Sequence, residues 1–459
     1  MPLFFESHPI QTLLYGNRSV RQVYLGSRLI WPEALQHGIR SFGLCKTHAA
    51  FVLNDGTFWT IGSNKHGQLC RIDPGGSWTT PNLAQVPGIH DAVMVAVSCT
   101  ENGEGTTVLL RDRGRVFSAG FSNSESLYVS TSERIAWTSL GRHGISGSPI
   151  FSNFSEVIGL SQICNLWHGR QRLLVQRSNG FVYGYGLDWD VNRAMFQWMQ
   201  VKDSGGQPLH CADISLHALS PVILRSDGSV DFTGPIAPWF RPVSWPTQDT
   251  NILEPVPRTS FLTGIRKITT GRSHLVVLTQ NGLLHTVGSD RFGQLCSEKF
   301  QYRNPEQGCL LAGEPIVDIA CGDHHTVVLL HNGTVKTAGQ NHRGQLGRAV
   351  VTGNGHDWLY YTGPDRVTEE GWFGNFDVIP GIEDATAVYA GGDMTMILRE
   401  SGITVCGDNE FGQLGIMTEQ HITNADDRMV WCENWHGSRP SFETNLRNAK
   451  FHESWNFQG

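Results

Sequence analysis

Histidine recurs at a fixed spacing in this chain and is the residue type best suited to chemistry. His48, His274 and His325 each precede a glycine by eight residues. Because neutral imidazole is a common metal ligand, such a series could form a ring of ligands. The alternative is that each imidazole bonds backbone inside its own repeat. Equivalent positions of a repeat lie far apart, so the sequence favours the structural role. Four other repeats carry other residues at this place, namely Thr106, Arg172, Ser220 and Met394.

The cysteines offer no motif of their own. All ten stand singly and no C-x-x-C pair occurs, so zinc-ribbon spacing is absent. Free cysteines are commonly buried as small apolar residues. We expect inert core thiols, with disulfides or a metal as the alternative. The ten are Cys45, Cys70, Cys99, Cys164, Cys211, Cys296, Cys309, Cys321, Cys406 and Cys432.

Recognised catalytic motifs are missing as well. The sequence contains no nucleophile elbow, phosphate loop, zinc helix motif or paired-carboxylate constellation. The run Gly322 to His325 falls on the repeat frame and is explained by it. We therefore predict a protein that is not an enzyme and that uses no cofactor and no metal, with a hidden hydrolase site as the alternative.

Aromatic side chains cluster in the long insertions between repeats. Exposed aromatic rings beside polar groups suit sugar stacking or a protein interface. The alternative is that the rings pack the insertions down onto the body of the protein. The candidate binding residues are Trp189, Trp198, Trp239, Phe240, Trp245, Trp358, Tyr360, Tyr361, Trp372 and Phe373.

Paired glycines define the elements that must position these residues. Six pairs are six residues apart, and a seventh, Gly402 and Gly407, is one residue shorter. Apolar and β-branched residues stand between and before the glycines, as in DGTFWTIG and AAFVLND. This predicts two strands meeting at an Asn-Gly or Asp-Gly hairpin, with a third strand upstream and a fourth from the linking segment. The six pairs are Gly56 and Gly62, Gly114 and Gly120, Gly180 and Gly186, Gly228 and Gly234, Gly282 and Gly288, Gly333 and Gly339.

Composition agrees with many short strands and turns. The chain of 459 residues has 52 Gly, 17% charged residues and a formal net charge of -7, with no run of like charges. A polyanion-binding surface is not indicated, so we expect no nucleic-acid partner. No apolar stretch approaches the roughly 18 residues that span a bilayer, and we expect neither membrane insertion nor a secretory signal.

Four repeats continue into a longer phrase: GSNKHGQLC, GSDRFGQLC, GQNHRGQLG and GDNEFGQLG. Together with the G-x-x-H and Asn/Asp-Gly elements, this resembles the repeat of the regulator-of-chromosome-condensation family over roughly residues 38 to 432. The resemblance implies an all-β fold, a β-propeller in which the blades cover one another. We predict seven blades, with six as the alternative because repeats two to four lack the G-Q-L phrase. The repeat glycines are Gly56, Gly62, Gly67, Gly282, Gly288, Gly293, Gly333, Gly339, Gly344, Gly402, Gly407 and Gly412.

The ends of the chain do not follow the repeat. Residues 19–33 predict two short strands around Gly26-Ser27. The sequence of residues 19–33, SVRQVYLGSRLIWPE, also resembles small V-Y-x-G-x-x-L-I/V-W modules of bacteriophage tail and other virion proteins. The resemblance implies that this segment docks onto a virus particle. The alternative is an extra sheet on the propeller. We expect an N-terminal hairpin module (1–36), a propeller (37–432) and a closing or docking extension (433–459). The candidate docking residues are Val23, Tyr24, Leu25, Leu29, Ile30 and Trp31.

Three functions follow from these patterns. The first is a bacteriophage virion structural protein, a tail, fibre or baseplate component. Its partners would be other virion proteins, with a host-surface glycan or receptor as a weaker inference. The second is a guanine-nucleotide exchange factor for a small GTPase, as the resemblance implies. The third is a free-standing propeller interaction module. The expected location is the virion for the first and the cytoplasm otherwise.

Overall fold

The glycine pairs end strands in the computed structural model of the chain, as expected. Gly56, Gly282 and Gly333 have φ angles of +80°, +84° and +84°, a region that glycine enters without the steric cost a side chain brings. Each therefore closes a tight hairpin. The structure describes residues 4–5, 8–9, 13–15, 18–20, 23–25, 28–31, 38–71, 79–99, 105–120, 154–157, 159–169, 172–187, 194–202, 207–216, 221–232, 264–288, 292–296, 315–341, 343–348, 373–399, 403–414, 431–432 and 452–453.

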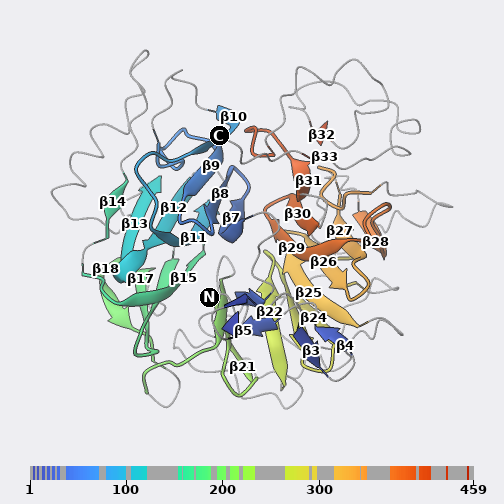
Figure 1. Cartoon of the computed structure of the whole chain (residues 1–459), viewed down its shortest axis with the longest axis horizontal. Coiled ribbons are helices and arrows are strands. Elements are labelled where there is room, and N and C mark those ends of the chain that lie inside the picture. The colour runs from blue at the N-terminus through green and yellow to red at the C-terminus, as the bar shows by residue number, and fades with distance from the viewer. Residues whose placement is uncertain are drawn as a thin grey trace, which may run out of the picture.

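Seven sheets follow one another around a ring (Figure 1), which confirms the predicted seven-bladed all-β fold. The first three are β7 (Ile39–Cys45), β8 (His48–Leu53), β9 (Phe58–Ser63) and β10 (Thr79–Gln85); β11 (Ala92–Cys99), β12 (Gly105–Arg111), β13 (Arg115–Gly120) and β14 (Ser155–Glu156); and β15 (Ile163–Gly169), β16 (Arg172–Arg177), β17 (Val182–Leu187) and β18 (Ala194–Gln200).

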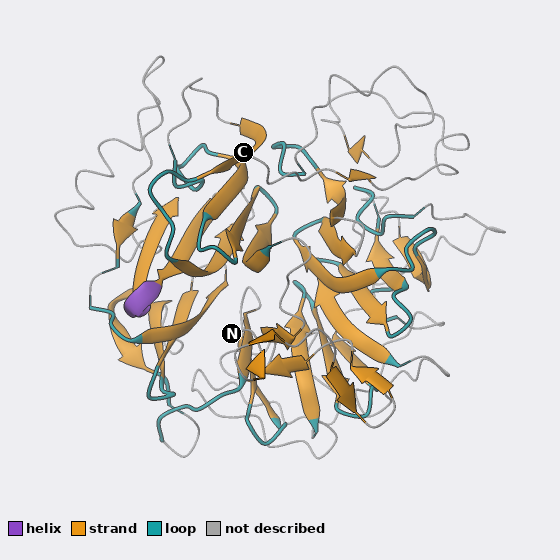
Figure 2. Cartoon of the chain, viewed as in Figure 1, coloured by secondary structure: helices purple, strands orange, loops and turns teal. Residues whose placement is uncertain are grey.

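The last four sheets complete the ring. They are β19 (Asp213–Leu216), β20 (Pro221–Leu224) and β21 (Val230–Phe232); β22 (Ile265–Thr270), β23 (His274–Thr279) and β24 (Leu284–Gly288); β25 (Ile316–Cys321), β26 (His325–Leu330), β27 (Val335–Gln340) and β28 (Phe373–Val378); and β29 (Ala385–Gly391), β30 (Met394–Arg399) and β31 (Ile403–Asp408), with β32 (Trp431–Cys432) and β33 (His452–Glu453). Strands dominate the described residues, beside one 3-10 turn, η1 (Asp112–Gly114) (Figure 2).

Neighbouring strands pair antiparallel in chain order, and the register places equivalent residues at equivalent sites. His48 pairs with Gly62, His274 with Gly288 and His325 with Gly339. The second glycine of each pair therefore lies opposite the recurrent histidine position. The first strands of successive sheets contact one another, from β7 through β11, β15, β19, β22 and β25 to β29 and back to β7. They line the axis of the ring.

Seven apolar clusters fill the joints between successive sheets. The reason is visible in β8, where Ala49 and Phe51 pack toward the seventh sheet while Ala50 and Val52 pack toward the second. A strand buried on both faces reads as a continuous apolar run rather than an alternating one. Each sheet thus depends on both neighbours for burial of its faces.

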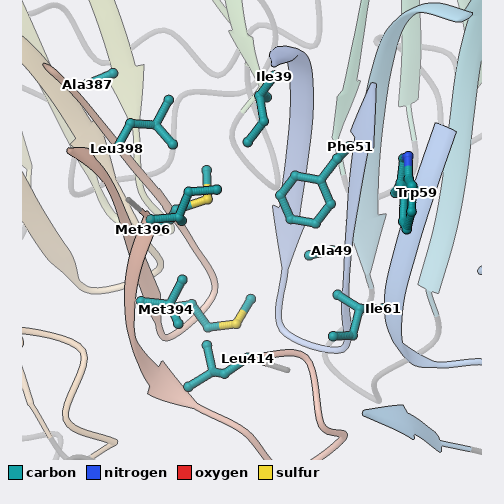
Figure 3. Packing of buried hydrophobic residues seen from close by; sticks show 12 residues of the cluster. Ile39, Ala49, Phe51, Trp59, Ile61, Ala387, Met394, Met396, Leu398 and Leu414 are labelled. Atoms are coloured by element: carbon teal, nitrogen blue, oxygen red, sulfur yellow. The ribbon is translucent and has the colours of Figure 1, made fainter. Parts of the chain in front are cut away.

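The seventh sheet meets the first through side chains. Phe51 and Ile61 pack against Met394, Met396 and Leu398 in one cluster (Figure 3). Among the described strands, no sheet combines strands from both ends of the chain. The two C-terminal strands join the seventh sheet, since β32 pairs in parallel with β31 and β33 pairs antiparallel with it. Of the two strands, β33 lies in the predicted extension (433–459) and β32 lies at the end of the predicted propeller (37–432). The closing role of the extension stays a prediction.

Three two-stranded hairpins precede the ring. They are β1 (Phe4–Phe5) with β2 (His8–Pro9), β3 (Leu13–Tyr15) with β4 (Arg18–Val20), and β5 (Val23–Leu25) with β6 (Arg28–Trp31). The third is the hairpin predicted around Gly26-Ser27, and its backbone pairing is confirmed. None of the helical structure in the described residues is long and apolar enough to cross a membrane.

Candidate functional site

The recurrent histidines bind across the joints between sheets. Nε2 of each lies 2.8 to 3.1 Å from a threonine hydroxyl of the next sheet, in the pairs His48 and Thr107, His274 and Thr326, and His325 and Thr395. The prediction that each imidazole bonds backbone inside its own repeat is therefore wrong. The adjacent strands already pair their backbone groups with one another, and the threonine of the next sheet is the polar group within reach.

Each threonine also bonds the preceding sheet a second time. Its hydroxyl donates to the main-chain oxygen of the glutamine in the G-Q-L phrase, at 2.6 to 2.7 Å, in the pairs Thr107 and Gln68, Thr326 and Gln294, and Thr395 and Gln345. A hydroxyl has one proton to donate, so the imidazole Nε2 must be the donor to it. We call this arrangement the His–Thr–Gln clamp.

The clamp explains which residue types occur together. Where a sheet carries the histidine, the following sheet carries the threonine, and this holds at all three places. The other four sheets follow a sheet without the histidine, and the threonine position is then Ala49, Leu173, Pro221 or Leu275. The repeat motif is thus a property of a pair of sheets. Thr107, Thr326 and Thr395 were missed in the sequence because each lies in the repeat after its partner.

The G-x-N-x-x-G-Q-L loops are held by their own polar side chains. The Oδ1 atoms of Asn64, Asn341 and Asn409 accept from the backbone N–H of the leucine at 2.9 to 3.0 Å. The glutamine Oε1 accepts from the backbone N–H two residues earlier, at 2.8 Å in all four loops. Buried polar groups require such partners. The phrase therefore encodes structure and not a catalytic site.

Glycine in the G-x-x-H element lets successive turns touch. A Cβ on Gly322 would lie 2.1 Å from Cε1 of His325 and 2.5 Å from the oxygen of Gly392 in the next sheet. Gly271 meets His274 and the oxygen of Gly322 at the same two distances. Backbone hydrogen bonds continue this contact, since the Asp323 N–H donates to the Gly392 oxygen at 2.8 Å. No side chain fits at these positions without displacing the turn.

Charged side chains gather where the turns of sheets six, seven and one meet. We call Lys46, Asp323, Arg343, Asp393, Asp408 and Glu410 the inner-turn cluster. Burial, together with the nearby Asp323 and Asp408, raises the pKa of Asp393 to about 7, against the effect of Lys46 and Arg343. Burial also raises the pKa of Asp408. Arg343 lies 4.0 Å from Asp408 and 3.9 Å from Glu410. The cluster presents both signs of charge.

The described part of the chain holds no group of three or more His, Cys, Asp or Glu side chains arranged for a metal ion. Gln413 of the seventh sheet donates from Nε2 to the Lys46 oxygen of the first, at 2.9 Å. This bond takes the place of the clamp at the seventh joint, where Met394 occupies the histidine position. Polar bonding across the joints therefore continues through sheets five, six, seven and one and into the second.

Two of the predicted aromatic residues fall within the described part. Trp198 is partly buried and packs on the apolar cluster between the second and third sheets, which supports the packing alternative for that residue. Phe373 begins β28, where its backbone pairs with Gln340. The remaining candidates lie outside the described residues, namely Trp189, Trp239, Phe240, Trp245, Trp358, Tyr360, Tyr361 and Trp372. Gly402 and Ser220 lie outside them too.

Comparison with protein-family models identifies the type of repeat in this chain. Residues 265–294 and 316–345 match the Regulator of chromosome condensation (RCC1) repeat, and residues 281–329 match a second family model of the same description. These segments include sheets five and six, where the clamp is complete. The chain is a seven-bladed β-propeller. It carries RCC1 repeats.

Solved structures agree on the fold. Yeast RCC1 (Prp20), in a crystal with Kap60, is similar with a TM-score of 0.61 and 16% identity, over 90% of this chain and 89% of that one. Human WBSCR16 is similar with a TM-score of 0.58 and 18% identity, over 80% and 88%. At such identities the likeness concerns the fold.

Curated relatives match a shorter segment. Mouse Serine/threonine-protein kinase Nek9 is 32% identical over 156 residues, which is 33% of this chain and 14% of the kinase. The mouse X-linked retinitis pigmentosa GTPase regulator is 28% identical over 156 residues, again 33% of this chain and 14% of the relative. A bovine Secretion-regulating guanine nucleotide exchange factor is 38% identical over 86 residues, 18% of each chain. The matched segment spans only a small part of these proteins.

Proposed function

We propose that this propeller is a non-enzymatic protein-binding scaffold. The observation that carries the proposal is the use of the repeat's polar residues. Histidine, threonine, glutamine and asparagine bind one another between and within sheets, and so hold the ring rather than a substrate. Among the described residues, the inner-turn cluster is a charged feature that a partner can contact through Arg343 and Glu410, and loops on a rigid scaffold commonly carry binding.

The partner that best fits is a small GTPase, with exchange of its nucleotide or regulation as the outcome. Two relatives are named a GTPase regulator and a guanine nucleotide exchange factor. The inner-turn cluster offers Arg343 and Glu410 as exposed or half-buried charges of opposite sign. Such a surface selects partners by charge complementarity. An exchange factor acts by binding the nucleotide-free partner better than the loaded one.

The test measures release of a fluorescent guanine nucleotide from a panel of small GTPases. We expect the wild-type chain to accelerate release from one member, and Arg343→Ala with Glu410→Ala to reduce this at least about tenfold. Glu410 is exposed and Arg343 half-buried, and an ion pair of this kind contributes little to folding, so the variant stays folded. Lys202→Ala, another exposed position, is the matched control. If no GTPase responds but an affinity-purified partner is lost in the double variant, the scaffold holds and the exchange role does not.

A virion structural role is the second candidate, and its motivation is the resemblance of residues 19–33 to virion modules. An isolated two-stranded hairpin is marginal in water, so the three hairpins of residues 4–31 call for a partner surface. In this reading Val23 to Leu25 and Leu29 to Trp31 dock on a particle. Mass spectrometry of purified particles, with a chain lacking residues 1–36 for comparison, tests it. Absence of the full chain from particles rejects the virion role and its location there, and favours the cytoplasmic alternative.

A further inference from the structure

One cysteine departs from the repeat at the clamp itself. In sheets five and six the residue three before the histidine is Gly271 or Gly322, each pressed against the imidazole. In the first sheet that place is Cys45, which pairs directly with His48 across β7 and β8. Its Sγ lies 3.1 Å from Nδ1 of His48, and the residue is 5% exposed. A thiol therefore occupies the position where sheets three, five, six and seven have glycine.

The clamp decides the direction of this hydrogen bond. Thr107 donates its hydroxyl proton to the Gln68 oxygen, so His48 donates from Nε2 to Thr107. The neutral imidazole then accepts at Nδ1. The Cys45 thiol and the Thr47 hydroxyl, 3.2 Å away, both face Nδ1 as donors, and His48 is placed as a base for the thiol. A nucleophile, a base and a group that orients the base make up the arrangement that activates thiols in many unrelated proteins.

A second thiol lies next to the first. Cys99 ends β11, the first strand of the second sheet, which lies against β7. It packs on the same apolar cluster as Cys45. The two strands lie close together, since a Cβ on Gly43, two residues before Cys45, would lie 2.9 Å from the backbone nitrogen of Val97, two residues before Cys99. Cys45 is buried, whereas Cys99 is partly exposed. The pair therefore joins two neighbouring sheets near the axis of the ring.

The surroundings separate this pair from the other cysteines. Burial opposes ionisation, yet the neighbouring Cys99 and His48 side chains hold the pKa of Cys45 well below its ordinary value. Burial raises the pKa of Cys211 and of Cys321 to about 12. Thiolates are the reactive form of cysteine. The expectation of inert core thiols thus fits Cys211 and Cys321 and does not extend to Cys45.

We propose that Cys45 and Cys99 are a redox-active thiol pair that a peroxide converts into a disulfide between the first and second sheets. The Cys45 sulfur attacks one peroxide oxygen, an S–O bond forms, the O–O bond breaks, and the proton held by His48 goes to the leaving oxygen to give water. The Cys99 sulfur then attacks the sulfenic sulfur of Cys45. The S–S bond forms, the S–O bond breaks, and the Cys99 proton leaves with the oxygen as a second water.

The electron and proton balance of disulfide formation is consistent with a peroxide as the oxidant. Two thiols lose two electrons and two protons in total, and one peroxide is reduced to two waters. A small oxidant is required because Cys45 is buried. The product would fix β7 to β11 covalently at the ends where the turns begin. A thiol reductant reverses the step by exchange.

The test treats the folded full-length chain with hydrogen peroxide, then alkylates the remaining thiols and identifies linked peptides by mass spectrometry. We expect one linked pair, Cys45 with Cys99, which thiol reductant releases. Cys70→Ser, a change in the same apolar cluster, leaves the link unchanged. Cys99→Ser leaves a sulfenic acid on Cys45 that a dimedone probe labels. Cys45→Ser abolishes both products.

The role of the histidine is tested separately. His48→Gln slows linkage at least about tenfold, since the base is lost. The exposed Cys164 serves as an internal standard for oxidant dose in every sample. The proposal is overturned if peroxide oxidises Cys164 in the wild-type chain and no Cys45–Cys99 link forms. It is also overturned if the link forms equally fast in His48→Gln.

Discussion

Two arcs of the ring solve the same packing problem differently. Sheets five, six, seven and one form the regular arc, whose polar bonds across the joints include the clamps and the Gln413 bond to Lys46. Sheets two, three and four form the irregular arc, which lacks the G-Q-L phrase. Its joints have other polar contacts in place of the clamp, such as Trp167 Nε1 to Asp213 Oδ1 at 2.9 Å and Ser215 to Thr270 at 2.8 Å.

The apolar clusters do not differ in this way, since every joint of both arcs has one. Burial of apolar surface therefore holds the blades together throughout the ring. The clamps add directional bonds that fix how the turns meet. Variants in the two arcs separate the two contributions, and the effects below run from the largest expected to the smallest.

Gly322→Ala tests the contact between the turns of sheets six and seven in the regular arc. The new Cβ would lie 2.1 Å from Cε1 of His325 and 2.5 Å from the Gly392 oxygen. Because the second neighbour is backbone, the turn itself must move, and we expect a loss of about 3 kcal/mol in the free energy of unfolding. Chemical denaturation measures it. Gly381→Ala is the control, because it has φ of +76° and open space around its Cβ position, and costs about 1 kcal/mol. Equal losses of unfolding free energy in Gly322→Ala and Gly381→Ala would show that the contact between turns does not contribute to stability.

Thr326→Val removes the centre of one clamp at nearly constant volume. Nε2 of His274 and the Gln294 oxygen both lose the hydroxyl as a partner, and both atoms belong to buried residues. We expect a loss of about 2 kcal/mol, since leaving buried polar groups without a bond is costly. Thr386→Val, which removes a partly buried 3.3 Å bond to Leu398, should cost about 0.5 kcal/mol. A smaller loss at Thr326 than at Thr386 contradicts the clamp.

Trp167→Phe probes the irregular arc. The ring stays apolar, while the indole N–H bond to Asp213 is lost. Asp213 Oδ1 keeps its bond from the Ile214 N–H at 2.9 Å, so we expect a loss of about 1 kcal/mol. Thermal unfolding of this variant beside Thr326→Val compares the arcs directly. A larger loss here than in Thr326→Val would mean that the irregular arc relies on polar bonds as heavily as the regular one.

Local patterns predicted the fold because each blade repeats one hairpin. The pairs Asp55-Gly56 and Asn332-Gly333 predict tight hairpin turns, and the apolar runs before them predict buried strands. The irregular arc has the glycine pairs but not the G-Q-L phrase, and the glycine pairs were enough to predict all seven sheets. Periodicity and turn chemistry are local, so a single chain displays them.

The site was harder to predict because its contacts cross from one repeat to the next. His274 and Thr326 are 52 residues apart, and only the register of two sheets brings them to 3.1 Å. Cys45 and Cys99 come onto one apolar cluster for the same reason, since neighbouring sheets place β7 beside β11. A signal was present in the sequence, since a threonine follows in each blade after a histidine blade. It becomes visible when successive repeats are compared as pairs and not aligned as equivalents.

Asp393→Asn gives the smallest effect and tests the inner-turn cluster, where the regular arc returns to the first sheet. Asp393 accepts a bond from Gln345 Nε2 at 3.2 Å, and burial and the nearby acids raise its pKa to about 7 from 3.8. Between about pH 4 and 7 the folded chain therefore binds more protons than the unfolded one. Stability falls as pH rises through this window, and above about 7 the loss is complete.

The Asn variant lacks that titration, so its stability relative to wild type should rise between pH 5 and 8. We expect about 0.5 kcal/mol, less than for Trp167→Phe, because Asp393 is only partly buried and solvent screens its carboxyl. Denaturation of both proteins at the two pH values measures the difference. Asp55→Asn is the control: hydrogen bonds from Thr57 lower the pKa of Asp55 despite slight burial, so its contribution is lost only as pH falls below about 4. Parallel profiles for Asp393→Asn and wild type would mean that the inner turns leave this carboxyl ionised, and that the cluster is open to solvent like the hairpins at the other end of the strands.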